Sequence, residues 1–294
     1  MPPSDPSHPE VESFFHRDTG TWTHVVHDDE AAAIIDPVLD YDPASARTST
    51  VSAEAVLAYV QQRALRVEWI LETHAHADHL SAAGYLRDGL DAPIAIGRGI
   101  IEVQAYFKQV FGLDDAFVAD GHQFDRLLDD GDALPIGSLS VRALATPGHT
   151  RDGLTYVAGN AAFIGDTLFA PDLGTARCDF PGGDAAELYA SIGRILALPE
   201  STRLFLCHDY PPQARTSGRE TTIGCEAKEN VQIGGGVGEA EFVTKRRARD
   251  ATLPVPRLLL PSLQVNIRGG RLPPAEADGH RYLRLPLNRI GRET

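Results

Sequence analysis

The sequence predicts an α/β fold in which helices cover the outer faces of β-sheets. Short apolar runs bounded by turn residues are interspersed with stretches of helical periodicity. These runs come in groups rather than in strict alternation with helices, which predicts sheets with helices packed on their outer faces. The chain has 294 residues, 43% of them hydrophobic, and can therefore bury a large core.

The first elements are predicted as strands followed by a helix. Strands are expected over residues 12–16, 22–27 and 31–37, the last ended by Pro37, and residues 40–50 form a polar link. Ser52 is predicted to cap a helix over residues 53–65, because apolar side chains recur there at helical spacing. Residues 66–73 then form a buried strand.

Further strands and helices are predicted along the rest of the chain. A hairpin is predicted at Gly159-Asn160, a dipeptide typical of two-residue turns. Helices are expected over residues 80–90, 100–110 and 184–198, and strands over residues 92–97, 139–150, 153–169 (two strands) and 203–210.

Composition argues against several classes of protein. The formal net charge of -14 repels phosphate backbones and anionic lipids, so neither nucleic acid nor a membrane is an expected partner. The N-terminus does not resemble a secretory signal, and no stretch approaches the roughly 20 apolar residues of a spanning helix. Three cysteines without metal-type spacing favour a reducing, cytoplasmic setting.

The sequence HAHADH, residues 74–79, is the most unusual stretch of the chain. Imidazole is the commonest protein ligand for transition metals, and carboxylate oxygen is its usual companion. Residues two apart in an extended segment point the same way, so this segment can offer ligands to one ion or two. The alternative, in which Asp78 merely caps a helix beginning near His79, leaves the histidines unexplained.

Further candidate ligands follow other predicted strands. His149, Asp166 and His208 each come directly after an apolar run, as His74 does. Four strand ends that all carry His or Asp predict a metal site at one edge of the sheets. The other histidines lack this setting and are predicted to be surface or core residues: His8, His16, His24, His27, His122 and His280.

The segments THAHADH, TPGHT, GDTLF and HDY, in this order, resemble the metallo-β-lactamase superfamily. The resemblance extends from about residue 12 to residue 235. It implies a four-layer αββα sandwich with the metal site at one edge of two sheets. We therefore expect residues 1–294 to form a single domain of this fold, with a C-terminal extension over about 236–294.

Two branches of this superfamily imply different metal centres, and a fold does not fix a reaction. In persulfide dioxygenases, His74, His149 and Asp166 would hold one Fe(II), and His76, Asp78, His79 and His208 would support that site. In zinc hydrolases of the glyoxalase II type, His74, His76 and His149 would hold one ion, and Asp78, His79 and His208 a second. Asp166 would bridge the two ions, which would activate a water for attack on a thioester.

Residues 172–184, DLGTARCDFPGGD, are similar to the persulfide dioxygenase pattern Gly-x-x-Arg-x-Asp-Phe. The resemblance implies that Arg177 is a cation near the substrate or the iron and that Asp179 is its hydrogen-bonding partner. Tyr210 stands where these enzymes place a tyrosine near a glutathione-bearing substrate. The simpler alternatives are an ordinary surface loop and a tyrosine that packs against it.

The tail around residues 258–274 looks like the C-terminal segment of bacterial persulfide dioxygenases. Arg268 is predicted to meet a glutathione carboxylate, because anion binding by so acidic a chain needs a local cation. The sequence departs from the family in lacking a cysteine-bearing GCGR stretch, and residues 246–261 have no clear counterpart.

The sequence thus predicts a mononuclear non-haem iron dioxygenase that oxidises glutathione persulfide with O₂ to sulfite and glutathione. A dinuclear zinc hydrolase of glutathione thioesters is the alternative enzyme, and a metal-dependent sensor without turnover is a third hypothesis. The metal, the exact substrate and the oligomeric state are left open, although a homodimer is possible.

Overall fold

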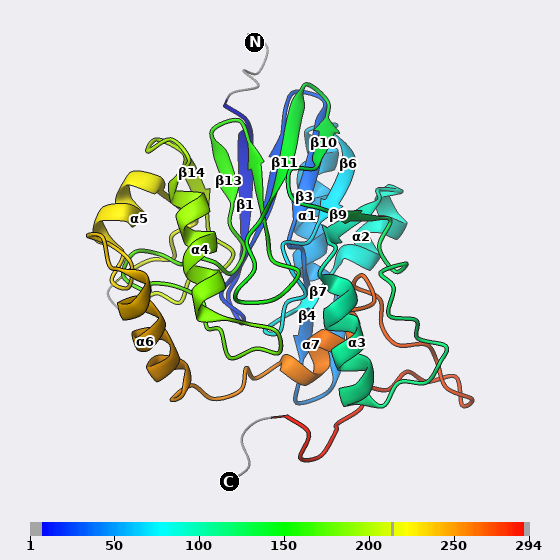
Figure 1. The fold of residues 1–294 in the computed structure, drawn as a ribbon. Helices are drawn as coiled ribbons and strands as arrows, with labels where there is room; N and C mark the ends of the chain where they lie inside the picture. Colours follow the sequence, from blue (N-terminus) through cyan, green and yellow to red (C-terminus); the bar gives the residue numbers. More distant parts are fainter. Residues whose placement is uncertain (1–7, 213–214, 291–294) are drawn as a thin grey trace.

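The computed structural model describes residues 8–212 and 215–290, and these form four layers, helices–sheet–sheet–helices (Figure 1). One group of helices covers the first sheet, and a second group covers the other. The αββα sandwich predicted from the resemblance is confirmed. The predicted terminal boundaries, at residues 1 and 294, lie outside the described residues.

The first sheet is mixed. Its strands β1 to β3 are antiparallel neighbours, whereas β3, β6, β8 and β9 run parallel. In sheet order, the strands are β1 (Glu10–His16), β2 (Thr21–His27), β3 (Ala31–Ile35), β6 (Arg66–Leu71), β8 (Ile94–Gly97) and β9 (Arg126–Leu128).

The second sheet is antiparallel except between β13 and β14. Its strands, in sheet order, are β10 (Ala133–Ile136), β11 (Leu139–Ala145), β12 (Leu154–Ala158), β13 (Ala161–Phe163), β14 (Arg203–Phe205) and β15 (Glu220–Thr222). The predicted hairpin is confirmed, because Ala158 pairs with Ala161 across Gly159-Asn160. Gly159 adopts a φ of 53°, which favours glycine.

A small third sheet forms where the sequence predicts a polar link. It consists of β4 (Val38–Asp42), β5 (Arg47–Ser49) and β7 (Leu80–Ser81), with β4 in the centre. Leu39 of β4 pairs with Leu80, which follows the HAHADH segment directly. The predicted polar link thus contains strands that the sequence did not predict, and the sheet fixes the exit of the histidine-rich segment.

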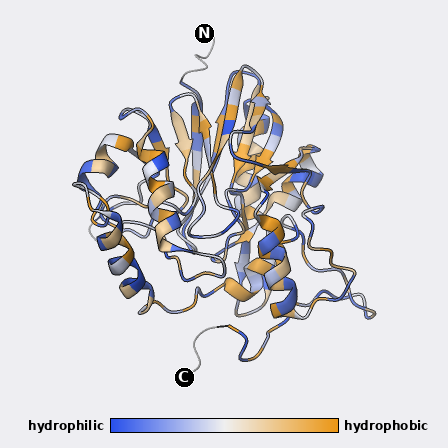
Figure 2. Ribbon diagram, in the orientation of Figure 1, coloured by the Kyte–Doolittle hydropathy of each residue, from blue (hydrophilic) through white to orange (hydrophobic). Residues whose placement is uncertain are grey.

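The two main sheets bury apolar side chains between them. Successive residues of a strand point to opposite faces, so Ile35 and Leu71 face the second sheet while Ile34 and Ile70 face the helices. Figure 2 shows hydrophobic residues concentrated on the central strands, whereas the outer helix α6 is mostly hydrophilic.

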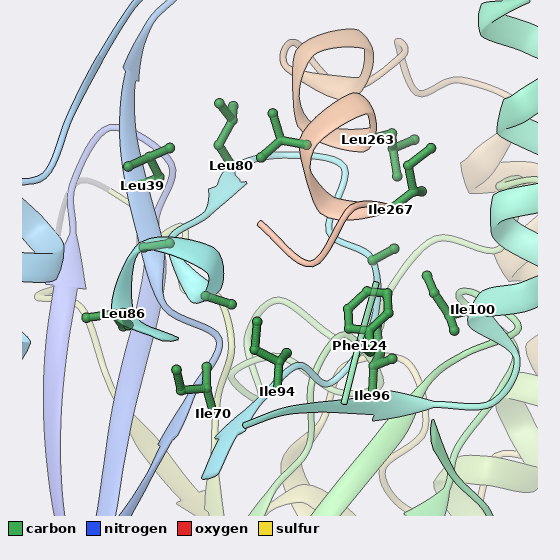
Figure 3. Packing of buried hydrophobic residues seen from close by; sticks show 14 of the residues in the cluster. Leu39, Ile70, Leu80, Leu86, Ile94, Ile96, Ile100, Phe124, Leu263 and Ile267 are labelled. Atoms are coloured by element: carbon green, nitrogen blue, oxygen red, sulfur yellow. The ribbon is translucent and has the colours of Figure 1, made fainter. Parts of the chain in front are cut away.

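Four helices cover the first sheet, and apolar side chains from the sheet and these helices form one cluster (Figure 3). Leu263 and Ile267 bring the C-terminal region into this cluster. The helices are α1 (Val51–Gln62), α2 (Ala83–Leu90), α3 (Ile100–Phe111) and α7 (Leu259–Asn266).

Two helix starts differ from the predictions. Helix α1 begins at Val51, with Thr50 at the N-cap position but without a capping hydrogen bond from its side chain. Ser52 lies inside the helix, and its amide and hydroxyl both donate to the Asp40 carboxylate. Helix α2 begins at Ala83, so Asp78 does not cap it. The interpretation of Asp78 as a capping residue is therefore wrong.

Three helices cover the second sheet: α4 (Ala185–Leu196), α5 (Ile223–Glu229) and α6 (Glu239–Asp250). Asp184 caps α4, since its side chain accepts hydrogen bonds from the amides of Ala186 and Glu187. The predicted C-terminal extension thus contributes α6 to one outer layer and α7 to the other. Within the described residues, no helix is long and apolar enough to cross a membrane.

Candidate metal centre

Four segments that each follow a strand bring the predicted ligands together. Residues 72–79 follow β6, His149 follows β11, Asp166 follows β13 and His208 follows β14. Gly165 allows the turn that presents Asp166: its φ is 51°, and a Cβ there would lie 2.8 Å from the Thr73 hydroxyl oxygen.

These residues form two adjacent donor groups, in each of which the possible ligand atoms lie within 4.8 Å of one another. The first donor group is His74, His149 and Asp166, and the second donor group is His76, Asp78, His79 and His208. All seven residues of the predicted site are therefore gathered in one place.

Asp166 lies between the two donor groups. Its Oδ2 is 3.6 Å from His149 Nε2 in the first group, and its Oδ1 is 3.4 Å from His208 Nε2 in the second. The His76 ring also lies between the groups, with its centroid 4.1 Å from that of His74 and 4.3 Å from that of His79. The geometry is that of one continuous cluster with a carboxylate at its centre.

Several donor atoms of this cluster are buried without a hydrogen-bond partner among the described residues. They are His74 Nε2, His76 Nδ1, His79 Nε2, His208 Nε2 and Asp166 Oδ1. Buried polar atoms are rarely left unsatisfied, because each costs roughly 1–3 kcal/mol. A metal ion or ions would satisfy them, so the cluster fits the metal site predicted from the sequence.

Groups outside the two donor groups contact ring nitrogens of the histidines and orient the rings. His76 Nε2 lies 3.0 Å from Asp36 Oδ1, a charge contact that holds this side of the ring. His149 Nδ1 donates to the Arg177 carbonyl over 2.7 Å. Such contacts fix the tautomer and ring orientation of a metal-binding histidine.

Burial and charge compete within the cluster. Burial and the neighbouring histidines lower the pKa of His74 well below its usual value. Burial also disfavours the charged form of His76, but Asp36 and Cys207 together outweigh it and hold the pKa well above normal. At His208, the charges of Asp78, Cys207 and Asp166 together likewise outweigh burial and raise the pKa. Carboxylates therefore offset part of the cost of burying several imidazoles together.

The segment that carries the histidines is held by residues the sequence did not reveal as functional. Asn266 of α7 donates to the carbonyls of His76 and His79 over 2.7 and 2.8 Å and accepts from the Ser81 amide. Asp152 accepts from the Ala75 amide over 2.7 Å.

A signal for Asp36 was present, since it ends an apolar strand as the ligands do. None marked Asn266, because its contacts lie about 190 residues away along the chain.

A pocket of about 650 Å³ opens onto the cluster. His149 and Asp166 line it, as do the predicted residues Arg177 and Tyr210. Arg177 forms a two-point ion pair with Asp179, at 2.6 and 2.8 Å, and also donates to the Pro254 carbonyl. The predicted Arg177–Asp179 partnership is confirmed.

Tyr210 stacks on the His208 ring, and its hydroxyl lies 3.5 Å from Asp78 Oδ2. Arg268, by contrast, does not line this pocket but a separate one. The structure therefore does not bring Arg268 to the donor groups, contrary to its predicted role at the site.

Comparison with known proteins identifies the family. The sequence model of the Metallo-beta-lactamase superfamily matches residues 16–208, which include all seven donor residues. The chain belongs to this superfamily. The family predicted from the sequence is confirmed, and the chain is a metal-dependent enzyme of this superfamily.

Relatives within the superfamily carry names from different branches. The chain is 53% identical to a probable metallo-hydrolase of Burkholderia pseudomallei, over 95% of this chain and 99% of that protein. It is 47% identical to glyoxylase B2 of Dictyostelium discoideum, over 95% and 97%. Identity to the human mitochondrial persulfide dioxygenase ETHE1 is 30%, over 73% and 76%.

Among solved structures, ETHE1 from Myxococcus xanthus superposes with a TM-score of 0.70 at 28% identity. The superposition covers 89% of this chain and all of that one. The relatives at about half identity thus have hydrolase-type names, and the persulfide dioxygenases are more distant. The persulfide dioxygenase branch, which the sequence favours, is therefore less well supported than the glyoxalase II-type hydrolase branch.

Proposed function

We propose that this protein is a hydrolase with two metal ions that acts on glutathione thioesters, the alternative activity predicted from the sequence. The observation that carries the proposal is the position of Asp166, with one carboxylate oxygen near each donor group. The names of the relatives at 53% and 47% identity support the same choice.

The unsatisfied atoms of the second donor group favour two ions over one. A single ion at His74, His149 and Asp166 would leave His79 Nε2 and His208 Nε2 buried without hydrogen-bond partners, although His208 Nε2 lies 3.2 Å from Asp78 Oδ2. Each such atom costs roughly 1–3 kcal/mol. A second ion held by Asp78, His79 and His208 would remove that cost.

Imidazole and carboxylate donors suit zinc, although the same set accepts other first-row metals. When bound, two such ions would polarise the thioester carbonyl and lower the pKa of a water to about 7. The protein holds the donors in place: Asp36 orients His76, and the Arg177 carbonyl orients His149.

The pocket offers groups that match a glutathione-type substrate, which carries carboxylates. Arg249 and Arg257 line it, and neither forms an ion pair with a described carboxylate. Arginine binds carboxylates through two parallel hydrogen bonds. Phe180 and Leu253 add apolar surface for the acyl group.

Tyr210 stands at the border between pocket and donor groups, with its ring half-exposed. A phenol is protonated at neutral pH, so its hydroxyl can donate a hydrogen bond to a substrate that reaches Asp78. Its role is to position the substrate rather than to bind metal.

The proposal is tested by metal analysis and activity on the same preparation. Freshly purified protein should contain close to two metal ions per chain, and zinc-loaded protein should hydrolyse S-lactoylglutathione. His208→Gln should lower the metal content to one ion per chain, whereas His122→Gln, on an exposed loop, should leave it at two. One ion per chain and no thioester hydrolysis would overturn the proposal.

A mononuclear iron dioxygenase acting on glutathione persulfide is the second candidate. It is favoured by the compact first donor group, whose two histidines and one carboxylate match the ligand set of non-haem iron oxygenases. One Fe(II) held in this way leaves positions for O₂ and a sulfur substrate. The Arg177–Asp179 ion pair at the pocket is the predicted feature of that branch.

The same preparations distinguish the two candidates. If Fe(II)-loaded protein contains one iron per chain and consumes O₂ with glutathione persulfide, the dioxygenase replaces the hydrolase as the proposed function. If neither substrate is turned over by either metal form, a binding or sensing role takes its place.

A further inference from the structure

A second pocket, remote from the donor groups, lies where α2, the loop after α3 and the segment after α7 meet. Its volume is about 450 Å³, within the usual range for small-molecule sites. We call it the Arg268 pocket; it is lined by Arg87, Asp114, Ala116, Phe117, His122, Gln123, Arg268, Arg271, Leu272 and Pro274. None of these residues lines the pocket over the metal centre.

Three arginines converge on the Arg268 pocket, although the chain as a whole carries a net charge of -14. Two of them are neutralised by neighbours: Arg87 pairs with Asp125 at 2.6 Å, and Arg271 with Asp88 at 2.6 Å. Arg268 forms no ion pair with any described carboxylate. Arg268 is therefore the arginine of this pocket without an ion pair among the described residues, although the Asp114 carboxylate also lines the pocket.

Arg268 is held in place without a polar partner. Its guanidinium lies over the Phe117 ring, 4.5 Å from the centroid, and its Nη1 is buried without a hydrogen-bond partner among the described residues. Burial and the nearby Arg284 lower the pKa of Arg268, and Asp114 opposes this shift. A buried cationic nitrogen without an acceptor is costly, and a bound anion would remove that cost.

The remaining walls indicate what kind of anion fits. Ala116, Phe117, Leu272 and Pro274 give the pocket an apolar side, while the arginine fork matches a carboxylate or phosphate group. We propose that the Arg268 pocket binds a small molecule that joins a carboxylate or phosphate group to an apolar body. This site is additional to the proposed active site and independent of it.

The experiment is calorimetric titration of the metal-loaded full chain with benzoate, phenyl phosphate and the uncharged benzyl alcohol. We expect saturable binding of at least one anion and no saturable binding of the alcohol. The tighter of the two anions identifies whether carboxylate or phosphate is preferred. Arg268→Met, which retains an apolar stem on Phe117, should weaken anion binding at least tenfold, because charged hydrogen bonds are lost.

The matched control is Arg203→Met. Arg203 also lies over a phenylalanine ring, that of Phe205 at 4.7 Å, but on the second sheet. The Arg203→Met protein should bind the anions with the same affinity as the unmodified protein. Since anions can also bind metal, only binding that Arg268→Met weakens counts for this pocket.

Three outcomes would overturn the proposal: no saturable anion binding, equal binding by Arg268→Met, or equal binding of the alcohol. If Arg268→Met does not fold by circular dichroism, Arg268→Gln, which removes the charge but keeps a polar end, provides the same comparison. Thioester hydrolysis is measured in parallel, and its loss or retention leaves the anion result interpretable.

Discussion

Two sets of histidines are buried in this fold, and they differ in whether their ring nitrogens have partners. His24 lies on β2 inside the sandwich and uses both nitrogens: Nδ1 accepts from the Ser13 hydroxyl, and Nε2 donates to the Leu206 carbonyl, each over 2.9 Å. In the donor groups, His79 Nε2 and His208 Nε2 are as deeply buried but have no partner among the described residues. The unsatisfied nitrogen, not burial, is what marks a metal ligand.

The charges around the buried histidines differ from one residue to another. Burial lowers the pKa of His24 to about 4, which keeps it neutral. In the donor groups, the pKa of His79 is also lowered to about 4, whereas the pKa of His208, near Asp78 and Asp166, is shifted in the opposite direction. An imidazole must be neutral to bind a metal ion, so an ion bound beside these carboxylates would displace the proton that they otherwise favour.

Asp166→Ala should have the largest effect on metal-dependent activity, because Asp166 is near donors of both groups. We expect activity to fall more than about 100-fold, beyond the 10–100-fold typical of residues that only orient a ligand. Steady-state hydrolysis and metal content measure this. Asp172→Ala, which removes a surface carboxylate paired with Arg215, should leave both near normal; an active Asp166→Ala would contradict the proposed centre.

Asp36→Asn should lower metal affinity by about 10–100-fold. The amide would no longer hold His76 Nε2 as the carboxylate does at 3.0 Å. Competition with a chelator measures the affinity. The control is Asp28→Asn, which changes an equally hydrogen-bonded carboxylate between β2 and β3; it should reduce stability without changing metal affinity.

Asn266→Ala should have a smaller effect on metal affinity, of several-fold, since the ligands themselves remain. It removes hydrogen bonds to His76, His79 and Ser81, and leaving such buried groups unpaired costs roughly 1–3 kcal/mol. Thermal unfolding with and without metal measures both effects. Gln264→Ala, which removes an α7 amide bonded to Leu260 and Arg284, should change stability but not metal affinity.

His24→Gln should have the smallest effect on activity and should instead change how stability depends on pH. With the folded-state pKa at about 4 against 6.5 unfolded, only the unfolded chain takes up a proton between these values. The free energy of unfolding should therefore fall by about 3 kcal/mol as pH drops from 6.5 to 4.

Denaturant titrations between the two pKa values should show that the free energy of unfolding depends less steeply on pH in His24→Gln than in the unmodified protein. An identical pH dependence in both proteins would mean that His24 is not held neutral. Loss of metal from His24→Gln would break the distinction between the two sets of histidines.

Much of the site could be predicted from the sequence, because its donors follow apolar strands. His74, His149, Asp166 and His208 each end a run whose pattern marks it as a strand. The residues that hold these donors could not be predicted in this way. Asn266 reaches the site only because α7 packs beside β7, and Arg268 lies in a different pocket for the same reason.

The secondary structure outside the site also shows that elements with a local pattern could be predicted and elements that depend on distant pairing could not. The amphipathic α3 and α4 were predicted within a few residues, since their periodicity is local. The small sheet of β4, β5 and β7 was missed, because its strands are polar and are stabilised by pairing with distant segments.

The order of residues by itself determined which side chains stand at strand ends and which face of each strand is apolar, since these depend on local periodicity. Only the tertiary structure decided that seven donors from four segments meet and that Asp166 lies between the two groups. It also decided that both His24 nitrogens have hydrogen-bond partners while, among the described residues, Nε2 of His79 and of His208 has none. Local pattern fixes the direction of a side chain, but its partners depend on how the sheets and helices pack against one another.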